Sequence, residues 1–340
     1  MRRIALAALA LVLGLAGASS AGAGPKRFEL HVRWDVSGIA AEGARVAIDR
    51  YIVIGCDAIS IWDPVDAYDD WVEPTGFCSA SGESDLLALA GRQLLWADSF
   101  AANTYADGDV YSGQPGRVPA RLYSFETNFD SVGSGTDASG LAGQGPLLVF
   151  ATSDVRENGT VADSRLLLVE GRHTRLIRRL PEPVSFASVD AGRIAAKLGR
   201  GAVWVMDATG RVEAVARPRL RAVENLILQG GTLAIANAAR LETFDAATGR
   251  PLASWKLPHD ARLDDYASGF AALVSGNTVR LLNVWDGSSG IVAAPEGRQV
   301  HDVLAQLEPA GLFYAYSSES GSRPGHVVFV PWSELAPDLP

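Results

Sequence analysis

Acidic residues recur at one position along this chain, and carboxylates in such a pattern could hold a cation or a basic peptide segment. They stand just before or at the start of a short apolar segment in most of its repeats: Asp85, Asp137, Glu224, Asp264, Asp265 and Asp302. If these segments surround one axis, the acids form a ring that concentrates negative potential at one mouth. The competing explanation is structural, because turns favour Asp at many positions. The sequence therefore predicts a ligand-binding ring of acids, with turn chemistry as the alternative.

Catalytic motifs are missing from the sequence. It contains no Gly-x-Ser-x-Gly motif, and Gly287-Ser288-Ser289-Gly290 has the composition of a hairpin turn. The five histidines follow none of the His spacings typical of zinc sites: His31, His173, His259, His301 and His326. We therefore predict no catalytic residue, no metal site and no cofactor.

Two Asp-rich loops could offer oxygen ligands to calcium. One contains Asp63, Asp66, Asp69 and Asp70, and the other is Asp107-Gly108-Asp109. Neither has the twelve-residue spacing of a calcium-binding loop, so solvated acidic turns are the expected explanation.

The two cysteines, Cys56 and Cys78, are even in number and not in a C-x-x-C motif. In an exported chain this predicts a structural disulfide between them.

An internal repeat must position the acids. Apolar segments lead to turn glycines at Gly43, Gly91, Gly145, Gly192, Gly231, Gly269 and Gly311. A later apolar segment ends at an acid in the first six repeats, and near Val330 in the seventh. The six acids are Asp63, Glu126, Glu170, Asp207, Asp245 and Asp286. Both markers give a count of seven, with a period of the length typical of β-propeller blades.

These repeats predict an all-β chain that forms a single β-propeller of about seven four-stranded blades. A four-stranded sheet with two apolar faces can bury both of them only between neighbouring sheets. The predicted blades are 38–80, 81–130, 139–182, 184–218, 221–259, 262–295 and 298–334. Residues 28–34 alternate like a strand that pairs with the last blade, and residues 131–143 are Gly/Ser-rich and predict a flexible connection.

The repeat resembles that of tryptophan–aspartate (WD) repeat propellers and their bacterial relatives. Two copies contain the dipeptide itself, at Trp62-Asp63 and Trp285-Asp286. Residues 245–250, Asp-Ala-Ala-Thr-Gly-Arg, followed by Trp255, are similar to a blade of the pyrroloquinoline-quinone-type (quinoprotein-like) propellers. The sequence lacks the Gly-His pair usual in WD repeats, and its Trp255 stands further from Thr-Gly than in quinoprotein motifs. The resemblance implies the architecture more than a function.

The N-terminal residues predict export. Arg2 and Arg3 precede an uncharged apolar run, and Ala21-Gly22-Ala23 fits the small-residue rule of signal peptidase. We therefore expect a signal peptide at 1–23, a propeller at 24–340, and a secreted or extracytoplasmic location. The apolar run is too short to span a membrane. The net charge of −9 argues against nucleic acids and anionic membranes as partners.

Export, a repeat scaffold and the missing catalytic motif favour a binding module over an enzyme. We expect it to hold an extracytoplasmic protein, peptide or glycan through one face or the channel mouth. The alternatives are a propeller enzyme, either a quinoprotein-like dehydrogenase or a hydrolase or lyase acting at the channel mouth, and a structural subunit of an envelope assembly.

Overall fold

The computed structural model describes residues 27–52, 56–72, 83–101, 104–128, 133–199, 201–295, 300–318 and 325–335. These residues form antiparallel strands and one short helix, α1 (Trp332–Leu335), which confirms the expected all-β class. Across this part of the chain, no helix is both long and apolar enough to cross a membrane.

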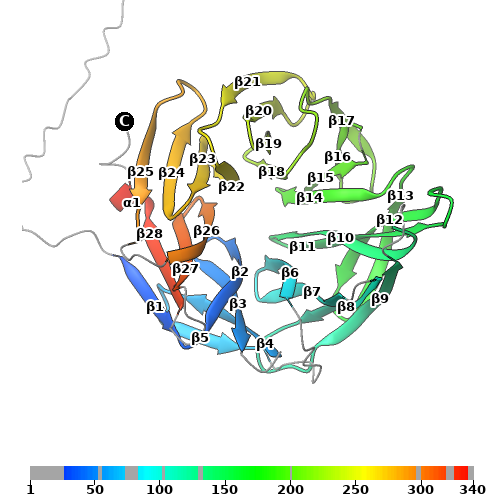
Figure 1. Cartoon of the computed structure of the whole chain (residues 1–340), viewed down its shortest axis with the longest axis horizontal. Coiled ribbons are helices and arrows are strands. Elements are labelled where there is room, and N and C mark those ends of the chain that lie inside the picture. The colour runs from blue at the N-terminus through cyan, green and yellow to red at the C-terminus, as the bar shows by residue number, and fades with distance from the viewer. Residues whose placement is uncertain are drawn as a thin grey trace, which may run out of the picture.

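The strands form six hydrogen-bonded sheets that follow one another around an axis (Figure 1). The first contains β2 (Asp35–Glu42), β3 (Arg45–Ile52), β4 (Cys56–Asp63) and β5 (Tyr68–Trp71). The second has eight strands, β6 (Glu83–Ala90), β7 (Gln93–Ala101), β8 (Tyr105–Gly113), β9 (Ala120–Asn128), β10 (Gly135–Gln144), β11 (Leu147–Val155), β12 (Val161–Glu170) and β13 (His173–Arg179). A single residue pair, Gly135 with Thr127, joins its two halves, β6–β9 and β10–β13.

The other four sheets have four strands each. They are β14 (Val184–Asp190), β15 (Arg193–Leu198), β16 (Val203–Asp207) and β17 (Val212–Ala216); β18 (Asn225–Gln229), β19 (Thr232–Asn237), β20 (Arg240–Asp245) and β21 (Pro251–Lys256); β22 (Ala261–Ala267), β23 (Phe270–Ser275), β24 (Thr278–Asn283) and β25 (Ser289–Ala293). The last contains β26 (Val300–Glu308), β27 (Gly311–Ser318), β28 (Gly325–Pro331) and, from the other end of the chain, β1 (Phe28–Val32).

Strand β1 closes the ring. It pairs antiparallel with β28, from Phe28 opposite Phe329 to Val32 opposite Gly325. This confirms the expectation that residues 28–34 pair with the last repeat. The strand is fixed by apolar contacts as well, because Val32 is buried and Phe28 packs on Phe329.

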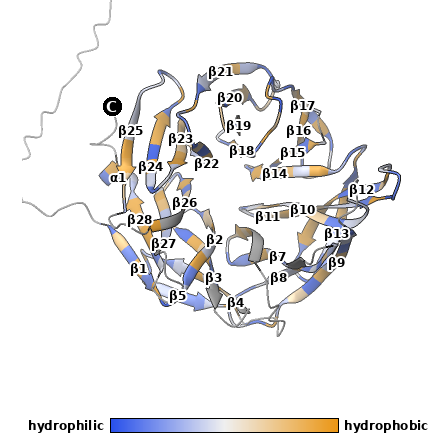
Figure 2. Cartoon of the chain, in the orientation of Figure 1, coloured by the Kyte–Doolittle hydropathy of each residue, from blue (hydrophilic) through white to orange (hydrophobic). Residues whose placement is uncertain are grey.

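Apolar side chains fill the spaces between neighbouring sheets. The described residues contain seven apolar clusters, each shared by two adjacent groups of four strands, with the halves of the eight-stranded sheet sharing one of them. On β19, Leu233 and Ile235 pack against the preceding sheet, whereas Ala234 and Ala236 pack against the following one. Both faces of a strand are thus buried, because successive side chains point to opposite faces. Figure 2 shows hydrophobic residues along the strands of every sheet.

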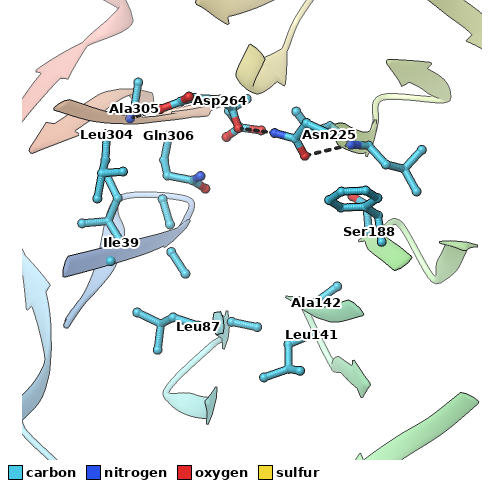
Figure 3. A pocket seen from close by; sticks show the side chains of 18 of the residues that line it. Ile39, Leu87, Leu141, Ala142, Ser188, Asn225, Asp264, Leu304, Ala305 and Gln306 are labelled. Atoms are coloured by element: carbon cyan, nitrogen blue, oxygen red, sulfur yellow. Dashed lines mark hydrogen bonds between the residues drawn. The ribbon is translucent and has the colours of Figure 1, made fainter. Parts of the chain in front are cut away.

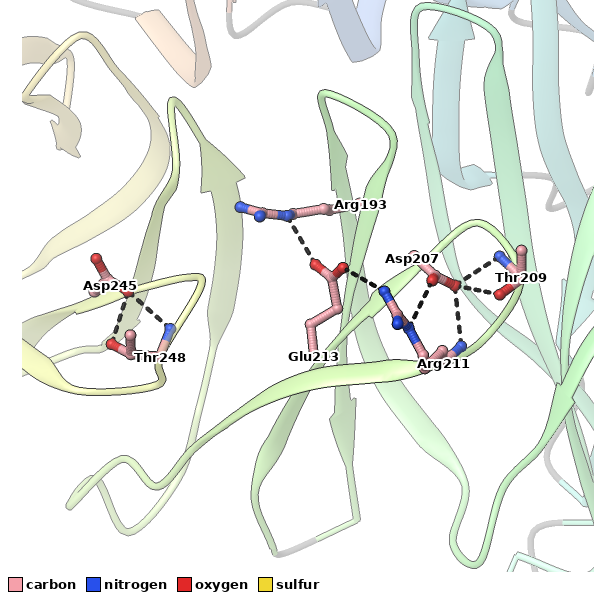
Figure 4. Close-up of polar contacts among 7 residues, drawn as sticks. All are labelled: Arg193, Asp207, Thr209, Arg211, Glu213, Asp245 and Thr248. Atoms are coloured by element: carbon pink, nitrogen blue, oxygen red, sulfur yellow. Dashed lines mark hydrogen bonds and ion pairs between the residues drawn. The ribbon is translucent and has the colours of Figure 1, made fainter.

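The acids that mark the repeat hold turns. Asp207 Oδ1 accepts hydrogen bonds from the backbone N–H and hydroxyl of Thr209, and Asp245 Oδ1 accepts the same pair from Thr248 (Figure 4). These hydrogen bonds, above all those from the threonine hydroxyls, lower the pKa of both carboxyls. Glu126 was wrongly matched to this set. It lies in β9, the fourth strand of its group, whereas Asp207 and Asp245 end third strands.

The expected flexible connection at residues 131–143 is also wrong over its described part, because Gly135–Gln144 is strand β10. Small residues are needed there for close packing. A Cβ on Gly143 would lie 2.7 Å from the carbonyl oxygen of Leu89, and one on Gly140 would lie 3.1 Å from Val184 Cγ1. The Gly/Ser composition therefore reflects tight contacts between sheets, which a local reading of the sequence takes for a loop.

Some expectations fall outside the described residues. The predicted signal peptide at 1–23 and Cys78 are among them. Cys56 begins β4, but its side chain is not described, so the disulfide stays a prediction.

Candidate functional site

A cavity of about 1130 Å³ lies at the centre of the ring of sheets. The first strand of each group of four lines it: β2, β6, β10, β14, β18, β22 and β26. We call these the inner strands. Each inner strand leads into a turn that connects it to the second strand of its group. Backbone N–H groups in several of these turns donate hydrogen bonds to side chains of other groups, so the turns lie together at one end of the cavity. A cavity of this size is typical of ligand-binding sites.

The wall of the cavity carries both apolar and polar side chains. Ile39, Leu87, Leu141 and Leu304 are apolar members of the lining (Figure 3). Among the polar members, Asn225 donates from its amide to the carbonyl oxygens of Leu263 and Asp264. Such a mixed wall can accept a ligand with both an apolar body and a polar group.

The structure brings together only part of the predicted ring of acids. Glu224, Asp264 and Asp265 line the cavity. Asp137 is exposed on β10 and is not part of the lining. Asp85 and Asp302 belong to inner strands β6 and β26, but their side chains are not described. Ligand binding by these residues therefore stays a prediction.

Asp264 and Asp265 tie one sheet to the next. Asp264 Oδ2 accepts a hydrogen bond of 2.9 Å from the backbone N–H of Ala305, and Asp265 Oδ2 accepts one of 2.7 Å from Leu307. Asp264 is also paired with Arg262, which itself donates to the carbonyl oxygen of Val303. Neighbouring inner strands do not form a regular ladder, so these side chains satisfy backbone groups that would otherwise lack partners.

A second set of polar side chains forms the turn end of the cavity. We call it the turn-end rim: Gln144, Gln229, Asp265 and Glu308, which line the cavity, together with Glu42 and Asp190, which end β2 and β14 and lie close enough to act on the charge of Glu308. Three of its acids accept hydrogen bonds from turn backbones of other sheets. Glu308 accepts from Gly43, Asp190 from Gly230, and Glu42 from both Gly91 and Gly145. These bonds hold the carboxylates in place before any ligand arrives.

Glycine is required at two of these turns by backbone conformation. Gly91 and Gly145 have φ values of 63° and 59°, in the left-handed region. A Cβ at either position would meet nothing within 4 Å, so conformation and not space selects glycine. The turns thereby aim both N–H groups at Glu42.

The acids of the rim interact strongly. Burial, and then the charges of Asp265, Glu42 and Asp190, raise the pKa of Glu308 to about 8. Burial also raises the pKa of Asp265 to about 7. Carboxyls with such pKa values lie close to other negative charges or away from water, and a cation placed among them would lower the pKa again.

Gln229 adds an acceptor without a partner. Only 8% of the residue is exposed, and it lines the cavity. Its Oε1 atom has no hydrogen-bond partner among the described residues. A buried acceptor left without a donor costs about 1–3 kcal/mol, so this position favours a ligand that brings an N–H or O–H group.

The charge of the lining is negative. Five carboxylates are part of it, Asp35, Glu224, Asp264, Asp265 and Glu308, whereas Arg262 is the one cationic residue among its described members. Since Arg262 is already paired with Asp264, the cavity presents an excess of acidic groups to a ligand. Glu308, with a pKa of about 8, is largely protonated at neutral pH and would ionise when a cation is placed beside it.

The suspected calcium loops have partners of their own. Arg45 pairs with Asp63, Arg50 with Asp69, and Arg92 with Asp70. In the second loop, Asp109 accepts hydrogen bonds from Tyr111 and Ser124. These contacts account for Asp63, Asp69, Asp70 and Asp109 without a cation.

Sequence reasoning missed five acids and amides of the rim, Glu42, Gln144, Asp190, Gln229 and Glu308. A signal was present, because each stands one to three residues before one of the seven turn glycines. The glycines marked the repeat correctly, but the polar residue ahead of them was taken for part of the turn.

Comparison with known proteins finds similarity in structure alone. No protein-family model and no curated protein matches the sequence. The β-propeller domain of Cps50 (Swd1) from Myceliophteria thermophila is similar over 88% of this chain and 98% of its own, with 15% identity and a TM-score of 0.54. A chain in a crystal structure of the mitotic checkpoint complex matches over 97% of this chain and 99% of its own, with 14% identity and a TM-score of 0.54.

A third similar structure is the computationally designed protein Ika8. It covers 88% of this chain and 97% of its own, with 12% identity and a TM-score of 0.51. At these identities the likeness concerns the fold and says nothing of ligands. Together with the sheets that follow one another around one axis, it shows that the chain has the β-propeller fold.

Proposed function

We propose that this protein is an exported, seven-bladed β-propeller that binds a basic segment of a protein or peptide at its turn-end rim, without catalysis. The blade count is supported by seven groups of four strands, if the two halves of the eight-stranded sheet are counted as separate blades. Seven apolar clusters between adjacent groups agree with this count. Export is supported by the N-terminal sequence alone.

The observation that carries the binding proposal is the excess of acidic groups at the rim, which contains no basic residue, together with an amide oxygen that lacks a donor. Glu42, Asp190 and Glu308 are held by backbone N–H groups, and the buried Oε1 of Gln229 lacks a donor. A lysine or arginine side chain would bring both positive charge and several N–H donors to this place. The apolar wall formed by Ile39, Leu87 and Leu141 would contact the aliphatic part of the same side chain.

A glycan would fit this rim less well than a cation. Sugar hydroxyls can donate to carboxylates, but they bring no positive charge to offset the burial of Glu308 and its repulsion by other acids, which together raise its pKa. The quinoprotein-like and hydrolase or lyase alternatives stay predictions that no feature of the rim favours. The proposal therefore takes a cationic side chain as the ligand class.

Binding can be tested by NMR titration with short Gly/Ser peptides that differ in one central residue. We expect the peptides with arginine or lysine to bind, and the uncharged citrulline and norleucine peptides to bind at least about tenfold more weakly. Glu308→Gln and Gln229→Leu should each weaken arginine-peptide binding, whereas Glu157→Gln, an exposed acid in a distant turn, should not. Equal binding of the arginine and citrulline peptides would refute the proposal.

A further inference from the structure

The strand that closes the ring carries a second cluster of chemistry-bearing residues, distinct from the cavity. His31 on β1 and His326 on β28 are opposite each other in the strand pairing. Glu29 lies two residues before His31, so the two side chains are on the same face of β1. The three residues therefore meet on one face of the sheet, although 297 residues of chain separate Glu29 from His326.

Their ligand atoms are close together. Glu29 Oε1 is 2.8 Å from His326 Nδ1 and 3.9 Å from His31 Nε2, and all three ligand atoms lie within 4.8 Å of one another. In a tetrahedral zinc site with bonds of 2.0–2.2 Å, ligand atoms are about 3.4 Å apart. Small rotations of the two exposed side chains, Glu29 and His31, would reach that spacing, since they are 41% and 67% exposed.

His326 is the fixed member of the cluster. Its ring stacks on Tyr316 of β27, with centroids 4.6 Å apart and planes 4° from parallel. The His31 ring meets it edge-on at 4.8 Å. Stacking restricts the His326 ring to one plane, so less side-chain conformational entropy is lost when an ion binds.

We propose that Glu29, His31 and His326 bind one zinc ion, which fastens the first strand of the chain to the last. Two imidazoles and one carboxylate are ligands that suit zinc. Three protein ligands leave a fourth position for water or for a donor from another molecule. The absence of a sequence motif is expected, because two ligands come from opposite ends of the chain and meet only across a strand pair.

The test uses the full chain prepared without a histidine tag. Isothermal titration with Zn²⁺ should give one ion per chain, and Co²⁺ in its place should give the visible absorption of a four-coordinate centre. His31→Ala should weaken zinc binding by more than the about 10–100-fold that loss of an outer-shell partner costs. His31 is 67% exposed, so this variant is expected to fold. His326→Ala and Glu29→Gln should have the same effect.

A matched control is His259→Ala, which removes an exposed histidine that pairs with a single carboxylate, Asp260. It should leave zinc affinity unchanged. Zinc should also raise the melting temperature of the parent protein and not that of His31→Ala, because the ion binds only when β1 is paired with β28. Zinc affinity that is the same in His31→Ala and in the parent would overturn the proposal.

Discussion

Glu308 accepts a hydrogen bond of 3.2 Å from the backbone N–H of Gly43, although 265 residues separate the two in the chain. The contact joins the end of the last inner strand to the turn that follows the first. It is one of several side-chain bonds that connect neighbouring sheets around the cavity, and it places an acid where three other acids act on it. Ring closure and the charge of the rim are therefore properties of the same residue.

The pH dependence of stability should follow from Glu308 and Asp265. Their folded-state pKa values are about 8 and about 7, well above the value of about 4 for such groups in an unfolded chain. Between these values the folded protein holds protons that the unfolded chain releases, so the free energy of unfolding falls as pH rises from about 4 to 8. Glu308→Gln should be more stable than the parent at pH 9 by about 1–3 kcal/mol, and close to it at pH 4. Urea denaturation at several pH values measures this, and parallel curves for the two proteins would contradict it.

Glu42 should be worth more to stability than its position at a turn suggests. Its two oxygens accept hydrogen bonds from Gly91 and Gly145, which belong to two different groups of strands. Glu42→Ala would remove the acceptor of the part-buried Gly91 N–H and of the exposed Gly145 N–H, which water can reach, and should lower the free energy of unfolding by about 1 kcal/mol. Glu157→Ala, which removes an exposed acid, is the control and should change it by less than about 0.5 kcal/mol. Equal stability of the two variants in urea denaturation would show that the bonds contribute nothing.

The effects of mutating Arg50 and Asp69 on the free energy of unfolding should be strongly coupled. Its guanidinium is buried, donates to both oxygens of Asp69 at 2.9 Å, and stacks over Trp71 at 4.2 Å. Asp69→Ala should destabilise the protein by about 3–5 kcal/mol, because it leaves a buried charge without its partner. The double variant Arg50→Met with Asp69→Ala should recover part of that loss. A double variant whose loss equals the sum of the single losses would argue against the coupling.

The small residues of β10 should resist enlargement. Gly143→Ala places a methyl group 2.6 Å from Leu148 Cδ2 and 2.7 Å from the Leu89 carbonyl oxygen. We expect a loss of about 1–3 kcal/mol from overpacking, visible as a lower melting temperature. At Gly201, where the nearest atom to an added Cβ is 3.6 Å away, the same substitution should have little effect. Similar melting temperatures for the two variants would contradict the packing argument.

The sequence predicted the architecture well because its main signals are local. The turn glycines Gly43, Gly91 and Gly145 were identified from spacing alone, and all three have positive φ. The acids Asp207 and Asp245 were placed correctly at strand ends, where their side chains hold the turn. Both kinds of residue act on neighbours a few positions away, so a reader of the sequence can infer their role.

The site was harder to predict, because its partners are distant in the chain. Asp264 and Asp265 were expected to face a ligand. Each also accepts a hydrogen bond from a backbone N–H of the next sheet. Glu42 and Glu308 were passed over, since nothing near them in the sequence indicates which turns they would meet. Residues 135–143 were taken for a loop because the close contact that demands small residues involves Leu89 and Val184.

The pairing of β1 with β28 has a consequence for how the molecule is made. A ribosome releases Phe28 long before Phe329, so the earliest strand must stay without its partner until nearly the whole chain has been synthesised. Pairings this distant in sequence are slow to form, and an unpaired edge can meanwhile capture a strand of another molecule. Newly made chains would therefore be lost to aggregation mainly during the delay before this last pairing, and less through the weakness of any single sheet.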